Sequence, residues 1–280
     1  MGMATEKDAK GSVGSIEVIR CEEGICRASK EYLIGEEPLL IRVEGQPYSV
    51  IMRTPGEETF HAAGFCLAEG LVDIPGDIAT VGYCADMDPN VVEVTLQPGR
   101  KKKVSEQLGR RGFMSQTSCG ICGKELVKDM CQIVRPVTDN TEISVDEAIS
   151  CIEKIDEIQK YYKITNGSHA VVLFDSEMNI LSFAEDVGRH NALDKAIGRL
   201  FLARGLDQAR IVALSSRISY ELVQKAARAQ IPIMISISRP TALAVELGRS
   251  LNMTLACTRK KSGLMIFSGE ERLDRKSYAR

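Results

Sequence analysis

The chain has 280 residues, enough for one large domain or two of ordinary size, and 44% of them are hydrophobic. Its 36 basic and 38 acidic residues leave a net charge of -2, which argues against a nucleic-acid binder held by general positive charge. No apolar run approaches the roughly 20 residues that span a bilayer, and the polar residues 1–13 contain no signal-peptide core. We therefore expect a cytoplasmic protein that acts without nucleic acid or membrane.

The first part of the chain predicts a mixed α and β unit. Hydrophobic spacing and turn residues indicate strands over residues 37–43, 47–52, 81–84 and 91–96 and a helix over 57–70. The basic run 98–103 and the segment 109–112 follow, and together they indicate a mobile loop or a domain boundary. We accordingly expect an N-terminal α+β domain over residues 1–112 and a second domain over 113–280.

The second domain shows strands that alternate with helices. We expect strands over residues 170–174, 180–184, 211–214, 233–237, 254–257 and 264–268, and helices over 123–132, 146–161, 192–203, 220–230 and 241–251. Short β-branched strands between helices of about ten residues predict an α/β fold, a layered sheet with helices on both faces.

Nine cysteines are the unusual feature of the composition. Most of them lie in apolar stretches, where a cysteine behaves as a small hydrophobe. Cys119 and Cys122 differ, because they form a Cys-x-x-Cys pair with glycines at 120 and 123. A helix starting after the pair, together with Lys124, would favour the thiolate form of both side chains.

Several interpretations of this pair compete. A structural zinc site needs four ligands, for which Cys21 and Cys26 would have to join the pair. The zinc-deaminase signature fails, because no Pro precedes Cys119 and no His-x-Glu segment is present. A thioredoxin-like site would follow a strand, and the polar run before Cys119 does not resemble one. A nucleophilic thiol on a flexible loop, suited to carrying a group, is the interpretation we favour.

A second pattern lies where the predicted strands of the second domain end. Four successive strand ends carry an arginine, namely Arg189, Arg217, Arg239 and Arg259, and His190 and Ser219 lie beside the first two. Loops at the carboxyl ends of strands line the ligand crevice of open α/β sheets, and helix N-termini there suit phosphate. Serine at a helix cap, arginine in a surface ion pair and a structural histidine are the alternatives for single residues. Taken together, the four predict a pocket for a polyanionic small molecule.

These motifs resemble a known family. The segments 117–124 (TSCGICGK), 185–195 (EDVGRHNALDK) and 215–217 (SSR), with Pro55-Gly56 and residues 64–70 (GFCLAEG), are similar to the formate dehydrogenase accessory sulfurtransferases of the FdhD/NarQ family. The match runs in the same order from about residue 37 to 267. The combination is specific to that family, whereas the Cys-x-x-Cys pair alone is not.

The resemblance implies a homodimeric cytoplasmic sulfurtransferase with a cytidine-deaminase-like second domain. Such a protein takes persulfide sulfur from a cysteine desulfurase and passes it to the molybdenum or tungsten of a bis(molybdopterin guanine dinucleotide) cofactor, Mo-bisPGD. That cofactor is destined for the catalytic subunit of formate dehydrogenase, and a guanine nucleotide would mimic it.

The resemblance also implies roles for particular residues. Cys119 would bear the persulfide, and Cys122 would either relay the sulfur or form a disulfide to release it. The cofactor-binding stretch would be Cys257, Thr258, Arg259, Lys260, Lys261 and Ser262, although the family has an aromatic residue where this chain has Cys257. Two other hypotheses stay open, a cofactor-binding chaperone whose thiols are idle and a zinc-stabilised interaction module.

Overall fold

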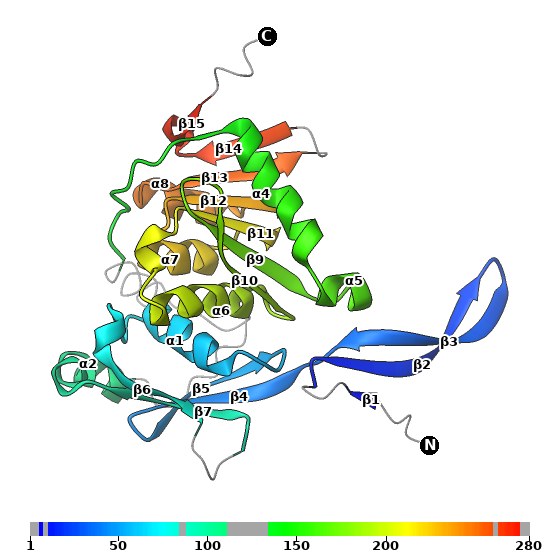
Figure 1. Ribbon diagram of the computed structural model, residues 1–280, viewed down its shortest axis with the longest axis horizontal. Helices are drawn as coiled ribbons and strands as arrows, with labels where there is room; N and C mark the ends of the chain where they lie inside the picture. The colour runs from blue at the N-terminus through cyan, green and yellow to red at the C-terminus, as the bar shows by residue number, and fades with distance from the viewer. Residues whose placement is uncertain (1–5, 8–10, 84–87, 111–133, 260–262, 275–280) are drawn as a thin grey trace.

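The computed structural model describes residues 6–7, 11–83, 88–110, 134–259 and 263–274 of the chain. In these ranges the polypeptide forms a projecting β-arm, a small four-stranded sheet and a larger six-stranded sheet. The small sheet and its helix α1 lie beneath the larger sheet, and the arm extends sideways from the junction (Figure 1).

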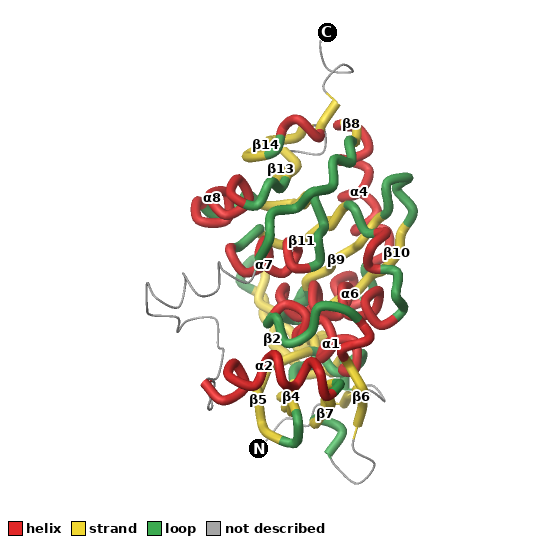
Figure 2. Tube along the Cα trace, turned by 90° about the vertical axis from the view of Figure 1, so that its left-hand side faces the viewer, coloured by secondary structure: helices red, strands yellow, loops and turns green. Residues whose placement is uncertain are grey.

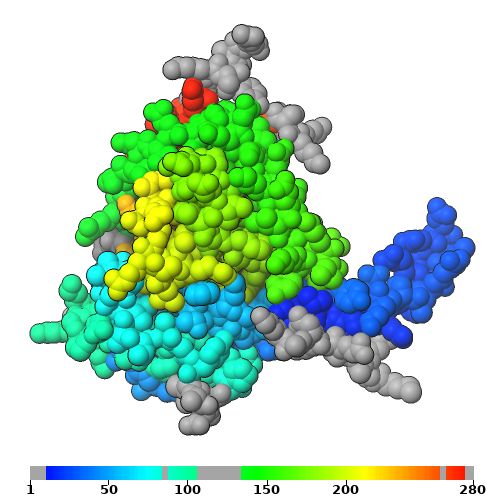
Figure 3. All heavy atoms as spheres, viewed as in Figure 1, coloured from blue at the N-terminus to red at the C-terminus, as the bar shows by residue number. Residues whose placement is uncertain are grey.

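The arm is the antiparallel hairpin of β2 (Val13–Glu22) and β3 (Ile25–Ile34), to which the short β1 (Glu6–Lys7) adds at one edge. Glu23 and Gly24 form its turn, and both have the positive φ of the two-residue turns that match the twist of a hairpin. The arm stands clear of the body of the molecule (Figure 3). The sequence analysis predicted no element in this segment.

The arm changes the interpretation of two cysteines. Cys21 and Cys26 face each other across the hairpin and form a disulfide. Both are exposed, so the expectation that most cysteines act as small buried hydrophobes is wrong for this pair. Because sulfurs joined in a disulfide offer no thiolate to a metal, this pair does not supply the second half of a zinc site.

The small sheet has the strand order β5-β4-β7-β6. Its strands are β4 (Glu37–Val43), β5 (Gln46–Arg53), β6 (Ile78–Tyr83) and β7 (Val91–Leu96), and its helices are α1 (Glu58–Ala68), a 3-10 helix (Pro75–Asp77) and α2 (Pro98–Arg110). The strands and the helix predicted before the basic run are confirmed.

The basic run after β7 is helical, whereas a mobile loop or a domain boundary was predicted. It opens α2, and Pro98 suits the first position of a helix because proline lacks an N–H. The Arg100 side chain is buried and donates to the carbonyl oxygens of Gly70 (2.6 Å) and Leu71 (2.7 Å), while it also pairs with Asp73. The run therefore supplies a cation that satisfies backbone carbonyls beyond the end of α1.

The larger sheet has the strand order β10-β9-β11-β12-β13-β14, in which β11, β12 and β13 are parallel. Its strands are β9 (His169–Phe174), β10 (Ile180–Asp186), β11 (Ile211–Arg217), β12 (Ile233–Ser238), β13 (Thr254–Arg259) and β14 (Gly263–Ser268). Its helices are α4 (Val145–Ile158), α5 (Tyr161–Thr165), α6 (Arg189–Leu202), α7 (Tyr220–Arg228) and α8 (Ala242–Ser250). A parallel pair of β8 (Ile143–Ser144) and β15 (Leu273–Asp274) and two 3-10 helices (Leu206–Gln208 and Glu270–Arg272) complete this part.

Helices cover both faces of the larger sheet, which confirms the predicted layered α/β class (Figure 2). Alternate strand residues such as Ala213 and Ile235 pack with α4 on one face. Their neighbours Val212 and Met234 pack with α6, α7 and α8 on the other. Because successive side chains of a strand point to opposite faces of the sheet, the strands contribute to two separate hydrophobic clusters, one on each face.

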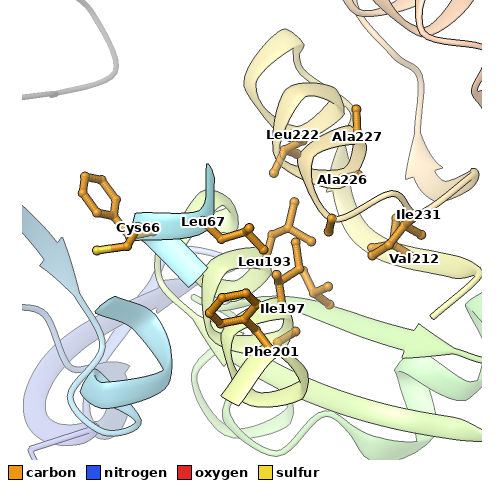
Figure 4. Close-up of a cluster of buried hydrophobic side chains, with 14 of the residues drawn as sticks. Cys66, Leu67, Leu193, Ile197, Phe201, Val212, Leu222, Ala226, Ala227 and Ile231 are labelled. Carbon is orange, nitrogen blue, oxygen red and sulfur yellow. The ribbon is translucent and has the colours of Figure 1, made fainter. Parts of the chain in front are cut away.

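Helices α1 and α6 cross with almost no space between their backbones. A Cβ on Gly198 would lie 1.9 Å from the carbonyl oxygen of Phe60, and one on Gly64 would lie 2.0 Å from that of Asp194. Around the crossing, buried side chains of α1, α6 and α7 meet in one hydrophobic cluster (Figure 4). The N-terminal and C-terminal parts therefore share a core, and the predicted boundary at residue 112 lies outside the described residues.

The helix predicted over residues 146–161 is interrupted. Ser144 caps α4 by accepting from the Glu147 N–H (3.1 Å), and the Glu147 carboxylate accepts from the Ser144 N–H (2.7 Å), a capping box. The helix ends at Ile158, and α5 begins at Tyr161. The helix predicted over 123–132 lies outside the described residues. Among the helices in the described ranges, none combines the length and hydrophobicity that crossing a bilayer requires.

Candidate functional site

The predicted binding residues come together at one edge of the larger sheet. Strands β11, β12 and β13 are parallel, and β10 runs in the same direction because β10 and β11 both pair antiparallel with β9. The carboxyl ends of four strands therefore share this edge, the position where open α/β sheets bind ligands. The residues there are Arg189 and His190 after β10, Arg217 and Ser219 at the end of β11, Arg239 after β12, and Cys257, Thr258 and Arg259 in β13.

Much of the motif that follows β10 is structural. The Asp186 carboxylate is fully buried and accepts from the backbone N–H groups of Thr54 (3.1 Å) and Gly188 (2.8 Å), from the Asn191 amide (2.9 Å) and from Lys195 Nζ (2.7 Å). These bonds fix the turn before α6 and tie it to the strand end of the small sheet. They leave Arg189 and His190 as the motif's candidates for contact with a ligand.

His190 contacts a residue that was predicted separately from it. Its Nε2 lies 3.1 Å from Ser219 Oγ and 3.0 Å from a carboxylate oxygen of Glu221. Burial, reinforced by the positive charges of Lys225 and Arg189, lowers the pKa of His190 to about 3. The imidazole is therefore neutral near pH 7 and acts as a hydrogen-bonding group rather than a cation.

Arg189 lies close enough to affect a second imidazole. Burial and the Arg189 charge both lower the pKa of His169, at the start of β9. The Nε of Arg189 is buried and has no hydrogen-bond partner in the described part of the chain. A cationic side chain at the start of α6, beside two neutral imidazoles, makes a local environment that favours an anion.

The free cysteines in the described ranges are buried, which disfavours their thiolate forms. Burial raises the pKa of the Cys66 thiol far above its usual range and that of Cys151 to about 12. It also raises the pKa of Cys257, although the nearby charge of Arg239 opposes the rise. Since the thiolate is the reactive form of cysteine, we do not expect these three side chains to act as nucleophiles, and the predicted cofactor contact of Cys257 stays a prediction.

Other predicted site residues fall outside the described residues. They are both members of the Cys-x-x-Cys pair, Cys119 and Cys122, and the end of the predicted cofactor-binding stretch, Lys260, Lys261 and Ser262. Their roles stay predictions. In the described ranges, no group of three or more His, Cys, Asp or Glu side chains is arranged to hold a metal ion.

A cavity of about 350 Å³ lies at the same edge of the larger sheet, on the face covered by α4. The residues that line it are Asp156, Gln159, Tyr162, Asn166, Gly167, Ser168, His169, Ser215 and Ile237. One buried carboxylate shapes its wall, because Glu185 accepts from the N–H groups at the start of α5 and from Ser168 Oγ (2.9 Å). Glu185 thereby holds α5 beside the cavity.

The sequence analysis singled out one lining residue, Ser215 in the segment 215–217, and did not predict the cavity itself. Two of its residues could have been predicted. Side chains alternate between the two faces of a strand, so Ser215 and Ile237 share the face of Ala213 and Ile235, which pack against α4, and lie nearer the carboxyl ends of the strands. The position of Gln159 in the cavity wall could not have been predicted from the sequence, because it depends on the residue at which α4 ends.

Comparison with known proteins places the chain in a family. The sequence model of the FdhD/NarQ family matches residues 34–274 of the chain. A "Sulfur carrier protein FdhD" of Streptomyces avermitilis is 33% identical over 283 residues, which cover 98% of this chain and 97% of the relative. A protein of the same name from Sulfurisphaera tokodaii is 37% identical over 247 residues, 87% of this chain and 92% of the relative.

A solved structure agrees with the fold. The crystal structure of a protein from Desulfotalea psychrophila, described as a formate dehydrogenase accessory protein, superposes with a TM-score of 0.73 at 22% identity and covers 92% of this chain and 97% of its own. That likeness shows the α/β fold alone. The family match and the two relatives show more: the chain belongs to the FdhD/NarQ family.

Proposed function

We propose that the protein is a sulfurtransferase required for formate dehydrogenase activity. It would receive persulfide sulfur from a cysteine desulfurase on Cys119 and deliver it to the metal of Mo-bisPGD before that cofactor enters the catalytic subunit of formate dehydrogenase. Membership of the family supports the proposal, as do relatives that are named sulfur carrier proteins.

The distribution of the thiols is the observation that carries the proposal. The chain has nine cysteines. Five lie in the described ranges, and none of these five is a thiolate, because Cys21 and Cys26 form a disulfide while the other three are buried with raised pKa values. Four cysteines lie outside these ranges, Cys84, Cys119, Cys122 and Cys131, and of these only Cys119 and Cys122 form a Cys-x-x-Cys pair, the motif suited to carrying sulfur.

The proposed chemistry is an exchange between sulfur atoms. The Cys119 thiolate attacks the outer sulfur of the donor persulfide, a new S–S bond forms, and the desulfurase cysteine leaves as its thiolate. Cys119 then bears the persulfide. In the next step Cys122 either accepts this sulfur and relays it, or attacks Cys119 to form a disulfide and release the sulfur as hydrosulfide.

The sheet edge described above suits the nucleotide tails of the acceptor. Arg189, Arg217, Arg239 and Arg259 occupy four neighbouring strand ends, and arginine binds phosphate through two parallel hydrogen bonds. The slightly acidic net charge of the chain makes this a local concentration of positive charge. We propose that the phosphates of Mo-bisPGD, or of a guanine nucleotide that mimics it, bind along this edge.

Complementation of a bacterium that lacks this gene tests the proposal. Cys119→Ala should abolish formate dehydrogenase activity, and Cys122→Ala should reduce it strongly. A Cys21→Ser, Cys26→Ser double variant is the matched control, because it removes two exposed sulfurs from the arm and should retain activity. Full activity of Cys119→Ala, with loss of activity on Arg217→Ala or Arg239→Ala, would instead indicate the cofactor-binding chaperone with idle thiols.

The expected homodimer and cytoplasmic location are further proposals, which sedimentation and cell fractionation would test.

A further inference from the structure

The projecting arm has a sheet edge that no described strand covers. Strand β3 is 10 residues long and pairs with β2 on one side, and within the described ranges no strand pairs with its other side. The arm stands clear of the body of the molecule (Figures 1 and 3). A long exposed edge of this kind is a template for a further strand, so the arm offers a surface for strand pairing.

The geometry of the hairpin shows which backbone groups face this edge. The Cα atoms of Cys21 and Cys26 lie 4.0 Å apart, the short separation of an antiparallel pair whose two residues are not hydrogen-bonded to each other. The N–H and C=O groups of Cys26 therefore point away from β2. Hydrogen-bonded and non-hydrogen-bonded pairs alternate along the strands, so Ala28 and Tyr32 present their backbone groups to the same outer edge.

The charges along the arm leave one arginine without a counterion among the described residues. Arg27 lies directly across the hairpin from Arg20, and like charges in this position are destabilising. Arg20 forms ion pairs with Glu22 and Glu31, whereas no described residue forms an ion pair with Arg27. A carboxylate from outside the described part of the chain would relieve this repulsion.

We infer that β3 pairs antiparallel with β3 of a second copy of this chain, about a two-fold axis at Ser29. This register places Arg27 opposite Glu31 of the second copy, and the symmetry supplies that ion pair twice. It also places Ile25 opposite Leu33 of the second copy, and these two side chains are 57% and 47% exposed in the single chain. The two arms then form one continuous antiparallel sheet.

The sequence of β3 favours this register over its neighbours. Because only every second residue presents its backbone groups to the edge, the two-fold axis must pass through a residue rather than between two residues. An axis at Ala28 would place Ile25 opposite Glu31, and an axis at Lys30 would place two lysines opposite each other, which is unfavourable. With the axis at Ser29, Lys30 lies opposite the small Ala28 instead.

Sedimentation velocity of the full chain over a range of concentrations tests the pairing. Arg27→Glu places like charges opposite Glu31 of the second copy and should weaken the dimer about tenfold to a hundredfold. The arm itself should stay folded, because the new carboxylate faces Arg20 within the hairpin. Glu31→Arg should weaken the dimer similarly. An equimolar mixture of the two variants restores opposite charges at both positions, so it should form a dimer of about wild-type affinity.

Proline substitutions test the backbone edge separately. Ala28→Pro removes an outward N–H of β3 and should weaken the dimer about tenfold. Ile19→Pro is the matched control, because Ile19 lies directly across the hairpin from Ala28 and its N–H faces the opposite edge of the arm. The dimer should therefore persist in Ile19→Pro.

Three results would overturn the inference. They are a monomeric wild type, which would leave the edge to a strand of another protein, a dimer that survives both Arg27→Glu and Ala28→Pro, and a mixture of the two charge variants that stays monomeric. Pairing through the arms assigns a surface to the expected homodimer and does not depend on sulfur transfer. Failure of the proposed function would appear separately, as absence of sulfur on Cys119.

Discussion

The buried ion pair between Asp186 and Lys195 offers a sharp test of how the two parts of the molecule are held together. Lys195 Nζ lies 2.7 Å from the Asp186 carboxylate and donates to the Thr54 carbonyl at 2.8 Å. The two charged side chains are 2% and 0% exposed. We expect Lys195→Met to lower the free energy of unfolding, because the methionine fills the space but leaves Asp186 charged and without its cation.

The size of the effect follows from the burial of both groups. Removing one partner of a buried ion pair costs about 3–5 kcal/mol, since the remaining charge stays in a medium of low dielectric. Whole proteins are stable by only about 5–15 kcal/mol, so the loss should be visible as a large drop in the urea midpoint. Adding Asp186→Asn to Lys195→Met removes the unpaired charge and should recover part of the loss, as expected for directly coupled residues.

Urea unfolding of the four proteins in this double-mutant cycle, followed by circular dichroism, measures the coupling. The exposed Lys102→Met serves as the matched control and should change stability by less than about 0.5 kcal/mol. A loss below about 1 kcal/mol for Lys195→Met, or purely additive effects in the double variant, would refute the view that this pair is a desolvated link between the small sheet and α6.

Three further predictions concern packing, protonation and thiol reactivity. Gly198→Ala should prevent folding or separate α1 from α6, because its Cβ would lie 1.9 Å from the Phe60 carbonyl oxygen; a native melting temperature would contradict this. Burial holds the pKa of folded His190 near 3 against 6.5 in the unfolded chain, so the unfolded chain binds more protons and stability falls as the pH drops below about 6.5. His190→Gln should therefore flatten the loss of stability between about pH 6.5 and pH 3, and parallel pH curves for the two proteins would contradict the burial argument. Cys66 and Cys151 should react with a thiol reagent only after unfolding, since burial raises both pKa values, and labelling of either in the native protein would contradict it.

The alternation of strands and helices in the second part of the chain could be predicted from sequence because it leaves a strong local pattern. Strands such as β12 are short and mostly apolar and lie between amphipathic helices, and the parallel connection follows from that order. The strand ends with their arginines could be located for the same reason. Sequence order alone then places Arg217 and Arg239 at one edge of the sheet.

The elements that sequence reasoning missed depend on contacts between distant segments. The arm exposes both of its faces near the tip, so burial imposes no alternation on its strands, and only the turn at Glu23 and Gly24 signalled a hairpin. Arg100 looked like part of a solvated run because the carbonyls that it binds lie some thirty residues earlier. The interruption after α4 arises because Glu185 binds the N–H groups at the start of α5.

The most direct test of the sulfur-carrying role is the intact mass of the purified chain after incubation with a cysteine desulfurase and cysteine. We predict a gain of one sulfur atom that mild reduction removes, mapped by peptide analysis to Cys119 and absent from Cys119→Ala. The Cys122→Ala variant should still gain the sulfur, since the first exchange needs only one thiolate. An unchanged mass of the wild type, or equal sulfur loading of Cys119→Ala, would contradict the proposal that this cysteine carries the sulfur.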